Sequence, residues 1–319
     1  MIIIDEATCI DLLDMKDAIP QMALSFRAIS EGQTLDIRGD VRDHEHESTG
    51  LLLGSYIGSL DGVCFKVIGD WHGKRGGLIA VFDTATGRPE ALVSAIHVTD
   101  LRTGAASGAA TELLARKDSR RLAIIGTGRQ SATQLQAMMC VRPIETVAVW
   151  NRTAAKGATW IESVRRSLGD GVPDIRLAAT AQEACDRADI VVVSTRAQVP
   201  VLRGEWLRPG SHINAIGAST PDQTELDLSV LRRAAVRAVD SRELALKTGD
   251  FIGPMEQGLL QPEDVCEIGE IFLGRRPGRD DDEEITLFKS VGHSANDLVL
   301  ARFLAERARK AGRGHIVEM

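Results

Sequence analysis

The amino-acid sequence predicts an α/β fold with two domains: one a doubly wound parallel sheet, the other an α+β domain. Two observations lead to this prediction: short apolar segments alternate with helical patterns from about residue 119 onward, and a different pattern of strands precedes them. The chain has 319 residues, and domains usually span about 100–200, so the length favours two cores. We expect residues 1–118 with 293–319 to form one domain and residues 119–292 the other.

The second domain is predicted from strands that are apolar, rich in β-branched residues and followed by turn residues, as is typical of a buried parallel sheet. These strands are expected at residues 121–125, 146–150, 190–194, 211–216 and 237–239. Helical patterns lie between them at residues 130–140, 154–167 and 181–187. Such alternation of strands and helices builds a parallel sheet with helices on both faces.

The first domain shows strands of alternating apolar and polar residues instead. Strands are expected at residues 62–68 and 78–83, with a turn at 86–89, and helices at 15–31, 101–116 and 295–311. We expect the helix at 295–311 to pack back onto this first part of the chain, which makes the domain α+β.

Composition argues against several classes of function. The chain carries 38 Lys and Arg against 45 Asp and Glu, a formal net charge of −7, so it lacks the basic excess typical of nucleic-acid binding. Its five cysteines never form a CxxC pair, which favours reduced thiols over a zinc site. No segment has the length of a membrane span, and the first apolar run is too short for a signal peptide. We therefore expect a cytoplasmic protein without nucleic-acid or membrane partners.

Two groups of residues resemble metal ligands, but we predict no metal. His44 and His46 stand in HxH spacing without a third ligand in view, so exposed loop histidines are the better interpretation. The acidic run at residues 279–284 is interpreted as a solvated loop ahead of a short helix at 285–290, because acids are favourable near a helix N-terminus.

A glycine loop follows the first strand of the second domain. Gly126 makes the tight turn, Gly128 lets the backbone approach a pyrophosphate, and the small Ser131 allows close packing of helix on strand. The helix N-terminus then offers N–H groups and the positive end of its dipole to the phosphates. This context predicts a Rossmann domain that binds NAD(P), with the loop contacts Gly126, Thr127, Gly128, Arg129, Gln130 and Ser131.

The end of the second strand indicates which cofactor is preferred. An NAD site usually carries Asp or Glu there for the ribose 2′-hydroxyl, but this chain has Asn151, Arg152 and Thr153. A cation and hydrogen-bond donors suit a 2′-phosphate, so NADP(H) is favoured and NAD(H) is possible. The alternative is that Arg152 is only a solvated loop residue.

Seven motifs resemble the ornithine cyclodeaminase and mu-crystallin family, in the family's order and over nearly the whole chain. They lie at residues 65–67, 81–87, 98–105, 125–131, 213–219, 225–227 and 286–292. The resemblance implies a homodimer in which a substrate-binding and dimerisation domain accompanies a Rossmann domain. Members move hydride between a nicotinamide and the α-carbon of an amino or imino acid, while some bind small ligands or serve as lens protein.

Lys66 and Arg102 are the expected catalytic residues. An ammonium group on so apolar a strand must reach water or meet a negative partner, and the resemblance implies that Lys66 contacts substrate. Arg102 begins a helix of small residues, where its guanidinium could grip an α-carboxylate through two parallel hydrogen bonds. An ordinary surface arginine is the alternative.

Other contacts are expected on the same grounds. If residues 36–44 form a strand, Arg38 and Arg42 share one face, and we favour Arg38 because its apolar lead-in resembles the family's. His293 precedes the last helix; the near-neutral pKa of histidine suits a proton donor, although a neutral hydrogen-bonding role is equally open. Thr99 is also expected to contact the substrate. Further cofactor contacts are expected at Arg102, Thr195, Ile216, Gly217 and Gly292.

Ser219 is an informative departure from the family pattern. The cyclodeaminases that the chain resembles carry an aspartate there, which works on the substrate amino groups. A serine supplies neither the charge nor the basicity, so ornithine cyclisation by the usual route is disfavoured. The segment is closer to the mu-crystallin side of the family, whose activity is ketimine reduction. Ser219 is kept as a substrate contact.

Together these features predict an NAD(P)H-dependent imine reductase acting on a small 2-imino carboxylate. A cyclic substrate, such as pyrroline- or piperideine-2-carboxylate, is favoured, with an L-amino acid as product. The alternatives are an ornithine cyclodeaminase, an alanine-type amino acid dehydrogenase, or a non-catalytic ligand-binding or structural protein. Retention of Lys66 and Arg102 speaks against the last, because a pure binder needs no carboxylate clamp beside a nicotinamide.

Overall fold

The computed structural model describes residues 1–43 and 48–318. The chain divides into two compact units: unit 1 is Met1–Ala105 with Gly292–Met319, and unit 2 is Ala106–Val291. The first division falls inside helix α3 (Ala95–Leu114), a helix that the sequence pattern assigns wholly to the first domain. The predicted fold class is confirmed: one unit is α+β and the other is a parallel α/β structure.

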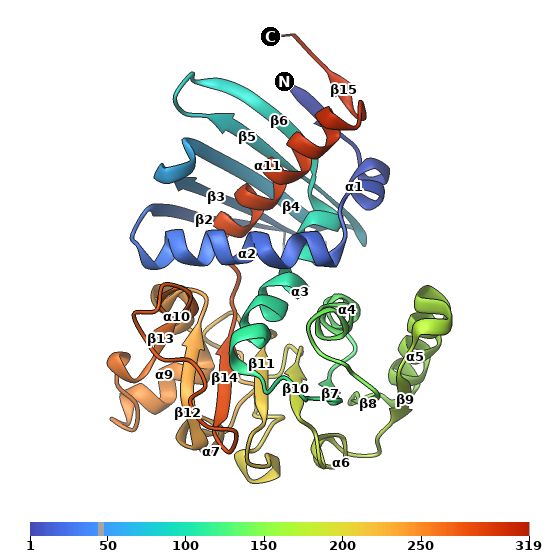
Figure 1. Ribbon diagram of the computed structural model, residues 1–319, viewed down its shortest axis with the longest axis vertical. Coiled ribbons are helices and arrows are strands. Elements are labelled where there is room, and N and C mark those ends of the chain that lie inside the picture. Colours follow the sequence, from blue (N-terminus) through green and yellow to red (C-terminus); the bar gives the residue numbers. More distant parts are fainter. Residues whose placement is uncertain (44–47, 319) are drawn as a thin grey trace. The chain divides into compact units, whose positions relative to one another are not determined.

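Unit 1 contains a seven-stranded sheet that is antiparallel apart from the pair β1 and β6. In spatial order its strands are β15 (His315–Ile316), β1 (Ile2–Ile4), β6 (Arg88–Ser94), β5 (Lys74–Asp83), β4 (Gly62–Trp71), β3 (Ser48–Ile57) and β2 (Thr34–Asp43). Its helices, besides the first half of α3, are α1 (Glu6–Leu12), α2 (Met15–Ser30) and α11 (Ser294–Lys310). Helix α11 packs on α2 and crosses β3 to β6 (Figure 1), as predicted for the last helix.

The two faces of this sheet differ because side chains alternate along a strand. On β4, Lys66 lies on the face that α11 covers and is 1% exposed, whereas Phe65 and Val67 point the other way and are 40% and 45% exposed. Apolar side chains continue across β2 to β5 on that uncovered side, here called the outer face: Leu35, Ile37, Val41, Leu52, Phe65, Val67 and Leu78.

Unit 2 contains an eight-stranded sheet in which all pairs are parallel. In spatial order its strands are β13 (Cys266–Glu267), β12 (Ala234–Val239), β14 (Ile285–Lys289), β11 (His212–Ala215), β10 (Ile190–Val193), β7 (Arg121–Ile125), β8 (Thr146–Trp150) and β9 (Asp174–Leu177). Its helices are α4 (Ser131–Val141), α5 (Ala154–Leu168), α6 (Ala181–Cys185), α7 (Leu228–Arg233), α8 (Arg242–Ala245), α9 (Gly249–Glu256) and α10 (Ile268–Phe272). The order of strands along the chain reverses between β7 and β10, and doubly wound sheets bind ligands at such a point.

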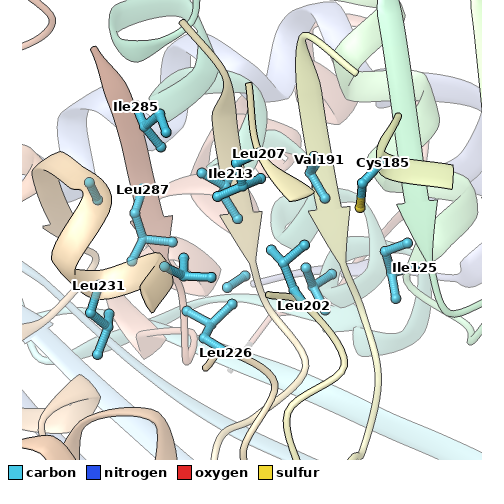
Figure 2. Close-up of a cluster of buried hydrophobic side chains, with 14 of the residues drawn as sticks. Ile125, Cys185, Val191, Leu202, Leu207, Ile213, Leu226, Leu231, Ile285 and Leu287 are labelled. Atoms are coloured by element: carbon cyan, nitrogen blue, oxygen red, sulfur yellow. The ribbon is translucent and has the colours of Figure 1, made fainter. Parts of the chain in front are cut away.

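Apolar side chains from neighbouring strands form the core on one face of this sheet. Ile125, Val191, Ile213 and Leu287 come from β7, β10, β11 and β14, and all four are fully buried. Figure 2 shows them beside side chains from the connecting segments, among them Leu202, Leu226 and Leu231. The core thereby holds in place the strand ends from which the loops after β7, β10 and β11 emerge.

The predicted helix at residues 285–290 is wrong, because Ile285–Lys289 forms strand β14 between β11 and β12. All of β14 is buried, and a short apolar segment enclosed by two parallel strands gains more from ladder hydrogen bonds than from one helical turn. The acidic run therefore meets no helix N-terminus. Instead the Arg279 side chain donates to the carbonyl oxygens of Leu114 and Glu284.

Within the described residues, none of the helices combines the length and the apolar character that crossing a membrane requires.

Candidate active site

Lys66 forms a buried ion pair with Asp297. Lys66 lies on β4, Asp297 lies in the first turn of α11, and Lys66 Nζ is 2.6 Å from Asp297 Oδ2. Both side chains are 1% exposed. Burial lowers the pKa of Lys66 to about 8, against the opposing attraction of Asp297. The negative partner that an ammonium group on this strand requires is therefore Asp297, a residue that sequence reasoning missed.

Arg102 approaches the other oxygen of the same carboxylate. Its Nε lies 3.4 Å from Asp297 Oδ1, while its two terminal nitrogens donate no hydrogen bond to any residue that the structure describes. Burial would raise the pKa of Asp297, but Lys66, Arg102 and Arg38 outweigh it, and the pKa lies below its usual value. The Asp297 carboxylate therefore stays charged, and its single negative charge is exceeded by the positive charges of the lysine and the arginines beside it.

Gly292 lies against Arg102 and Arg38. Its φ of +79° favours glycine, and a Cβ there would lie 2.7 Å from Arg102 Nη1. Its carbonyl oxygen accepts a hydrogen bond from Arg38 Nη2. Gly292 is predicted as a cofactor contact, and the structure brings it next to Arg38 and Arg102; its contact with a cofactor stays a prediction.

Arg38 and Arg42 both belong to β2, which supports the strand that sequence reasoning left conditional. Arg38 reaches Gly292, and its Nε lies 3.8 Å from Asp36 Oδ2. The side chain of Arg42 lies outside the described part of the chain, as do His44 and His46. Among the described residues, no group of His, Cys, Asp and Glu has the arrangement of a metal site.

His293 caps the N-terminus of α11. Its Nδ1 accepts a hydrogen bond from the Ala295 backbone N–H at 3.1 Å, and the side chain is 5% exposed. A neutral ring in this arrangement carries its proton on Nε2. Thr99 contributes a buried hydroxyl that has no hydrogen-bond partner within the described residues. We call the group of Lys66, Asp297, Arg102, Arg38 and His293 the unit 1 cluster.

The glycine loop of unit 2 has the features that a dinucleotide requires. Gly126 has φ +96°, and a Cβ there would lie 2.5 Å from the Ser194 carbonyl oxygen. At Gly128 the nearest atom to an added Cβ would be 3.7 Å away, so the space beyond the backbone is open. Ser131 begins α4 and is fully buried, as its expected packing role requires. The loop therefore fits the pyrophosphate that NAD and NADP share.

The turn after β8 connects to this loop through a side chain. Asn151 Nδ2 donates to Thr127 Oγ1 at 2.6 Å, and Asn151 Oδ1 accepts from the Thr153 backbone N–H at 2.8 Å. Arg152 is exposed and makes no hydrogen bond within the described part of the chain. Arg129 is also exposed, and Gln130 is the N-cap residue of α4.

The loops after β10 and β11 carry Thr195 and the pair Ile216 and Gly217. Thr195 and Gly217 both donate hydrogen bonds to the buried carboxylate of Glu225. Ser219 is exposed, and its backbone N–H donates to Gln223 Oε1 at 3.0 Å. The predicted residues thus form two groups, one within unit 1 and one at the carboxyl edge of the sheet in unit 2.

Comparison with known proteins places these residues in a family context. The model of the ornithine cyclodeaminase/mu-crystallin family matches residues 10–312. The chain is 36% identical over 317 residues to a Delta(1)-pyrroline-2-carboxylate reductase of Bacillus cereus, covering 96% of each chain. It is 37% identical over 228 residues to the ketimine reductase mu-crystallin of Mus musculus, covering 71% of this chain and 67% of the relative.

Solved structures give the same result. The Thermococcus litoralis Delta(1)-pyrroline-2-carboxylate reductase, in complex with NADH and L-proline, superposes with a TM-score of 0.90 at 34% identity, covering 99% of this chain and 100% of that one. An archaeal alanine dehydrogenase dimer with bound NAD superposes with a TM-score of 0.88 at 28% identity, covering 100% of this chain and 99% of that one.

Proposed function

Because the chain belongs to the ornithine cyclodeaminase/mu-crystallin family, we propose that it reduces a small, cyclic 2-imino carboxylate with NAD(P)H and releases an L-amino acid. The broader prediction, an NAD(P)-dependent oxidoreductase acting on a C=N bond, is confirmed by its relatives. One observation carries the finer proposal: Arg102 is nearly buried, shares Asp297 with Lys66 and has terminal nitrogens without acceptors among the described residues.

Arg102 and Lys66 supply binding and orientation in this proposal. Arg102 would hold the α-carboxylate of the substrate through two parallel hydrogen bonds, which define both its position and its plane. Lys66 adds a second positive charge, and Asp297 keeps both side chains in place. A bound nicotinamide supplies the hydride, so the task of these residues is to hold the imine carbon where hydride can reach it.

The reduction also requires a proton at the imine nitrogen. Lys66 has a pKa of about 8 and therefore exchanges protons near neutral pH. His293 is the donor that sequence reasoning proposes, and its Nε2 carries the proton when Nδ1 accepts from the helix backbone. The geometry within unit 1 supports both residues as the proton donor. The pH profiles of kcat/KM for Lys66→Met and His293→Gln would distinguish them.

Either nicotinamide cofactor fits the glycine loop, and we propose a preference for NADPH. The support is the Asn151-Arg152-Thr153 sequence after β8, where Arg152 is exposed and has no partner among the described residues. Relatives with solved structures were captured with NADH or NAD, so use of NAD(H) as a second cofactor is expected.

We further propose that two copies associate through the outer face of the unit 1 sheet. Contiguous apolar patches of this kind rarely stay exposed on a monomer, and Leu35, Ile37 and Val41 are 71%, 52% and 62% exposed. The archaeal alanine dehydrogenase relative is a dimer.

A double variant tests this interface. Ile37→Asp with Val67→Lys should give a monomer in sedimentation experiments. Leu177 is an exposed apolar residue of unit 2, and Leu177→Asp should leave the dimer intact. A double variant that remains dimeric would move the interface elsewhere.

A panel of substrates tests the proposed activity. The purified protein is given cyclic imines, or 2-oxo acids with amines, and consumption of NADH or NADPH is followed by absorbance. Ornithine is tested separately with the oxidised cofactor, by release of ammonia and formation of proline, because its cyclisation regenerates the cofactor and leaves the absorbance unchanged. We expect efficient reduction of pyrroline- or piperideine-2-carboxylate and poor conversion of ornithine, because Ser219 supplies no carboxylate. Faster turnover of pyruvate with ammonia would favour the alanine-dehydrogenase alternative, and ornithine conversion at the rate of the best imine would overturn the assignment.

A further inference from the structure

Glu225 is a fully buried carboxylate in unit 2 whose acceptor capacity is used by the backbone of two loops. Its Oε1 accepts from the Thr195 backbone N–H at 2.6 Å and from the Thr195 hydroxyl at 2.8 Å. Its Oε2 accepts from the backbone N–H groups of Gly217 at 2.7 Å and Ala218 at 2.9 Å. Glu225 belongs to the family motif at residues 225–227, and its sequence context alone assigns it no role.

The two loops begin where neighbouring parallel strands end. Thr195 follows β10 and Gly217 follows β11, which are paired along their whole length. Strand β10 is also paired with β7, from which the glycine loop emerges. These positions form the carboxyl edge of the sheet at its switch point, where doubly wound domains bind dinucleotides.

The loops tied by Glu225 are in close contact. A Cβ on Gly217 would lie 2.0 Å from the Thr195 carbonyl oxygen and 2.4 Å from Glu225 Oε1, so the backbone at Gly217 has no room for a side chain. A Cβ on Gly126 would meet the Ser194 carbonyl oxygen, which places the residue before Thr195 directly against the glycine loop. A shift of the Thr195 loop would therefore disturb the glycine loop as well.

Glu225 is in turn held by two other buried ionisable groups. Asp250 Oδ1 accepts from the backbone N–H of Glu225 at 2.7 Å and of Leu226 at 3.0 Å. Lys289 Nζ donates to Asp250 Oδ2 at 2.6 Å and lies 3.9 Å from Glu225 Oε2. Burial raises the pKa of Glu225, although Lys289 and the backbone donors oppose this.

We propose that Glu225 is a positioning residue for cofactor binding: it holds the loops after β10 and β11 in the conformation that receives the nicotinamide dinucleotide. This inference rests on the proposed function, and it changes the expected role of two predicted contacts. Thr195 and Gly217 donate these hydrogen bonds to Glu225, so the same groups do not donate to the cofactor. The two residues would instead contribute to the cofactor site through the position of their backbone.

Glu225→Gln tests the proposal by direct titration of NADH and of NADPH, followed by nucleotide fluorescence. The amide keeps the size of the side chain but turns one acceptor into a donor that faces N–H groups, so both dissociation constants should rise by about tenfold or more. The KM for the cofactor should rise with them, while the KM for the imine and kcat at saturating cofactor change much less.

Asp189→Asn is the matched control. Asp189 is 3% exposed, and its Oδ2 accepts from the backbone N–H groups of Arg120 and Arg121, each at 2.9 Å. It precedes β10 at the amino edge of the same sheet, opposite to the cofactor loops. A comparable loss of thermal stability is expected in both variants, but cofactor dissociation constants should rise only in Glu225→Gln. Equal cofactor dissociation constants in Glu225→Gln and Asp189→Asn would mean that Glu225 has only a structural role, and would overturn the proposal.

Thr195→Val provides a second measurement if Glu225→Gln does not fold. It removes the hydroxyl, which donates to Glu225 at 2.8 Å and accepts from the Ala197 backbone N–H at 3.3 Å, and leaves the hydrogen bond from the Thr195 backbone to Glu225 in place. A smaller rise in the NADH dissociation constant is therefore expected, and an unchanged constant would contradict the proposal. Failure of the proposed function is distinguishable, because the wild-type protein would then bind NADH without reducing any cyclic imine. Titration of the variants does not depend on that reaction.

Discussion

Two buried lysine–aspartate pairs lie in different units of the chain and have the same local geometry. Lys66 Nζ lies 2.6 Å from Asp297 in unit 1, and Lys289 Nζ lies 2.6 Å from Asp250 in unit 2. All four side chains are at most 1% exposed. Distance and burial alone therefore do not distinguish them.

The neighbours of the two pairs differ. Beside Lys66 and Asp297 stands Arg102, with terminal nitrogens that have no acceptor among the described residues, so cations exceed carboxylates. Beside Lys289 and Asp250 stands Glu225, so carboxylates exceed cations, and backbone N–H groups occupy the remaining acceptors. The first arrangement can attract an anionic substrate, whereas the second is internally satisfied. The third charged group, rather than the ion pair, is therefore the difference on which we base the proposed roles of the two sites.

The largest expected effect comes from removing the cation of each pair. Lys66→Met and Lys289→Met each leave a buried carboxylate without its partner, which should lower the free energy of unfolding by about 3–5 kcal/mol. Only Lys66→Met should also lower kcat/KM for the imine by at least about 10² at saturating cofactor. Denaturant unfolding and steady-state kinetics measure the two effects. Equal kinetic losses at saturating cofactor would remove the distinction between the pairs.

Arg102→Lys changes the third charged group beside Lys66 and Asp297, the proposed carboxylate clamp. The charge is retained but the planar fork is lost, so kcat/KM should fall by about 10², equivalent to about 2.7 kcal/mol. Cofactor affinity should change much less, because Arg102 lies outside the glycine loop and the lysine keeps the positive charge at this expected cofactor contact. Arg302→Lys is the control: this arginine pairs with Glu90 at 2.8 Å on the same unit, and its variant should keep wild-type kcat/KM. If Arg102→Lys and Lys66→Met were both near wild type, the clamp would lie at Arg38 or Arg42.

Arg152→Ala tests whether cofactor binding by unit 2 can be changed without affecting substrate binding by unit 1. The variant should lose about 1.5–3 kcal/mol of NADPH binding, because a charge-assisted contact to the 2′-phosphate is removed. NADH binding and the KM for the imine should not change, so NADH serves as the internal control in the same titration. A wild-type protein that binds NADH as tightly as NADPH would contradict the proposed preference.

A smaller effect is expected on the pH profile of Asp297→Asn. Lys66 must be protonated to attract a carboxylate, so wild-type kcat/KM should fall as pH rises through the Lys66 pKa of about 8. Asp297 raises that pKa, so its neutralisation should move the alkaline limb to lower pH by about one unit. A limb that stays in place would mean that another group controls it, with His293 the next to test by His293→Gln.

Much of the fold follows from local pattern. Apolar, β-branched segments predicted β7, β8, β10 and β11, because buried parallel strands carry this pattern without help from distant residues. Strand β14 was predicted as a helix, since a five-residue apolar segment after an acidic run satisfies either pattern. Its position between β11 and β12 decided the matter, and that position depends on strands far away in the sequence.

The sequence by itself determined the glycine loop, the family and the presence of a lysine and an arginine suited to a carboxylate. Only the tertiary structure paired Lys66 with Asp297, separated from it by 231 positions, and brought Glu225 to the loops after β10 and β11. The physical reason is that glycine turns and strand patterns act between neighbours in the chain, whereas a buried charge is stabilised by whatever partner the packing brings within hydrogen-bond distance.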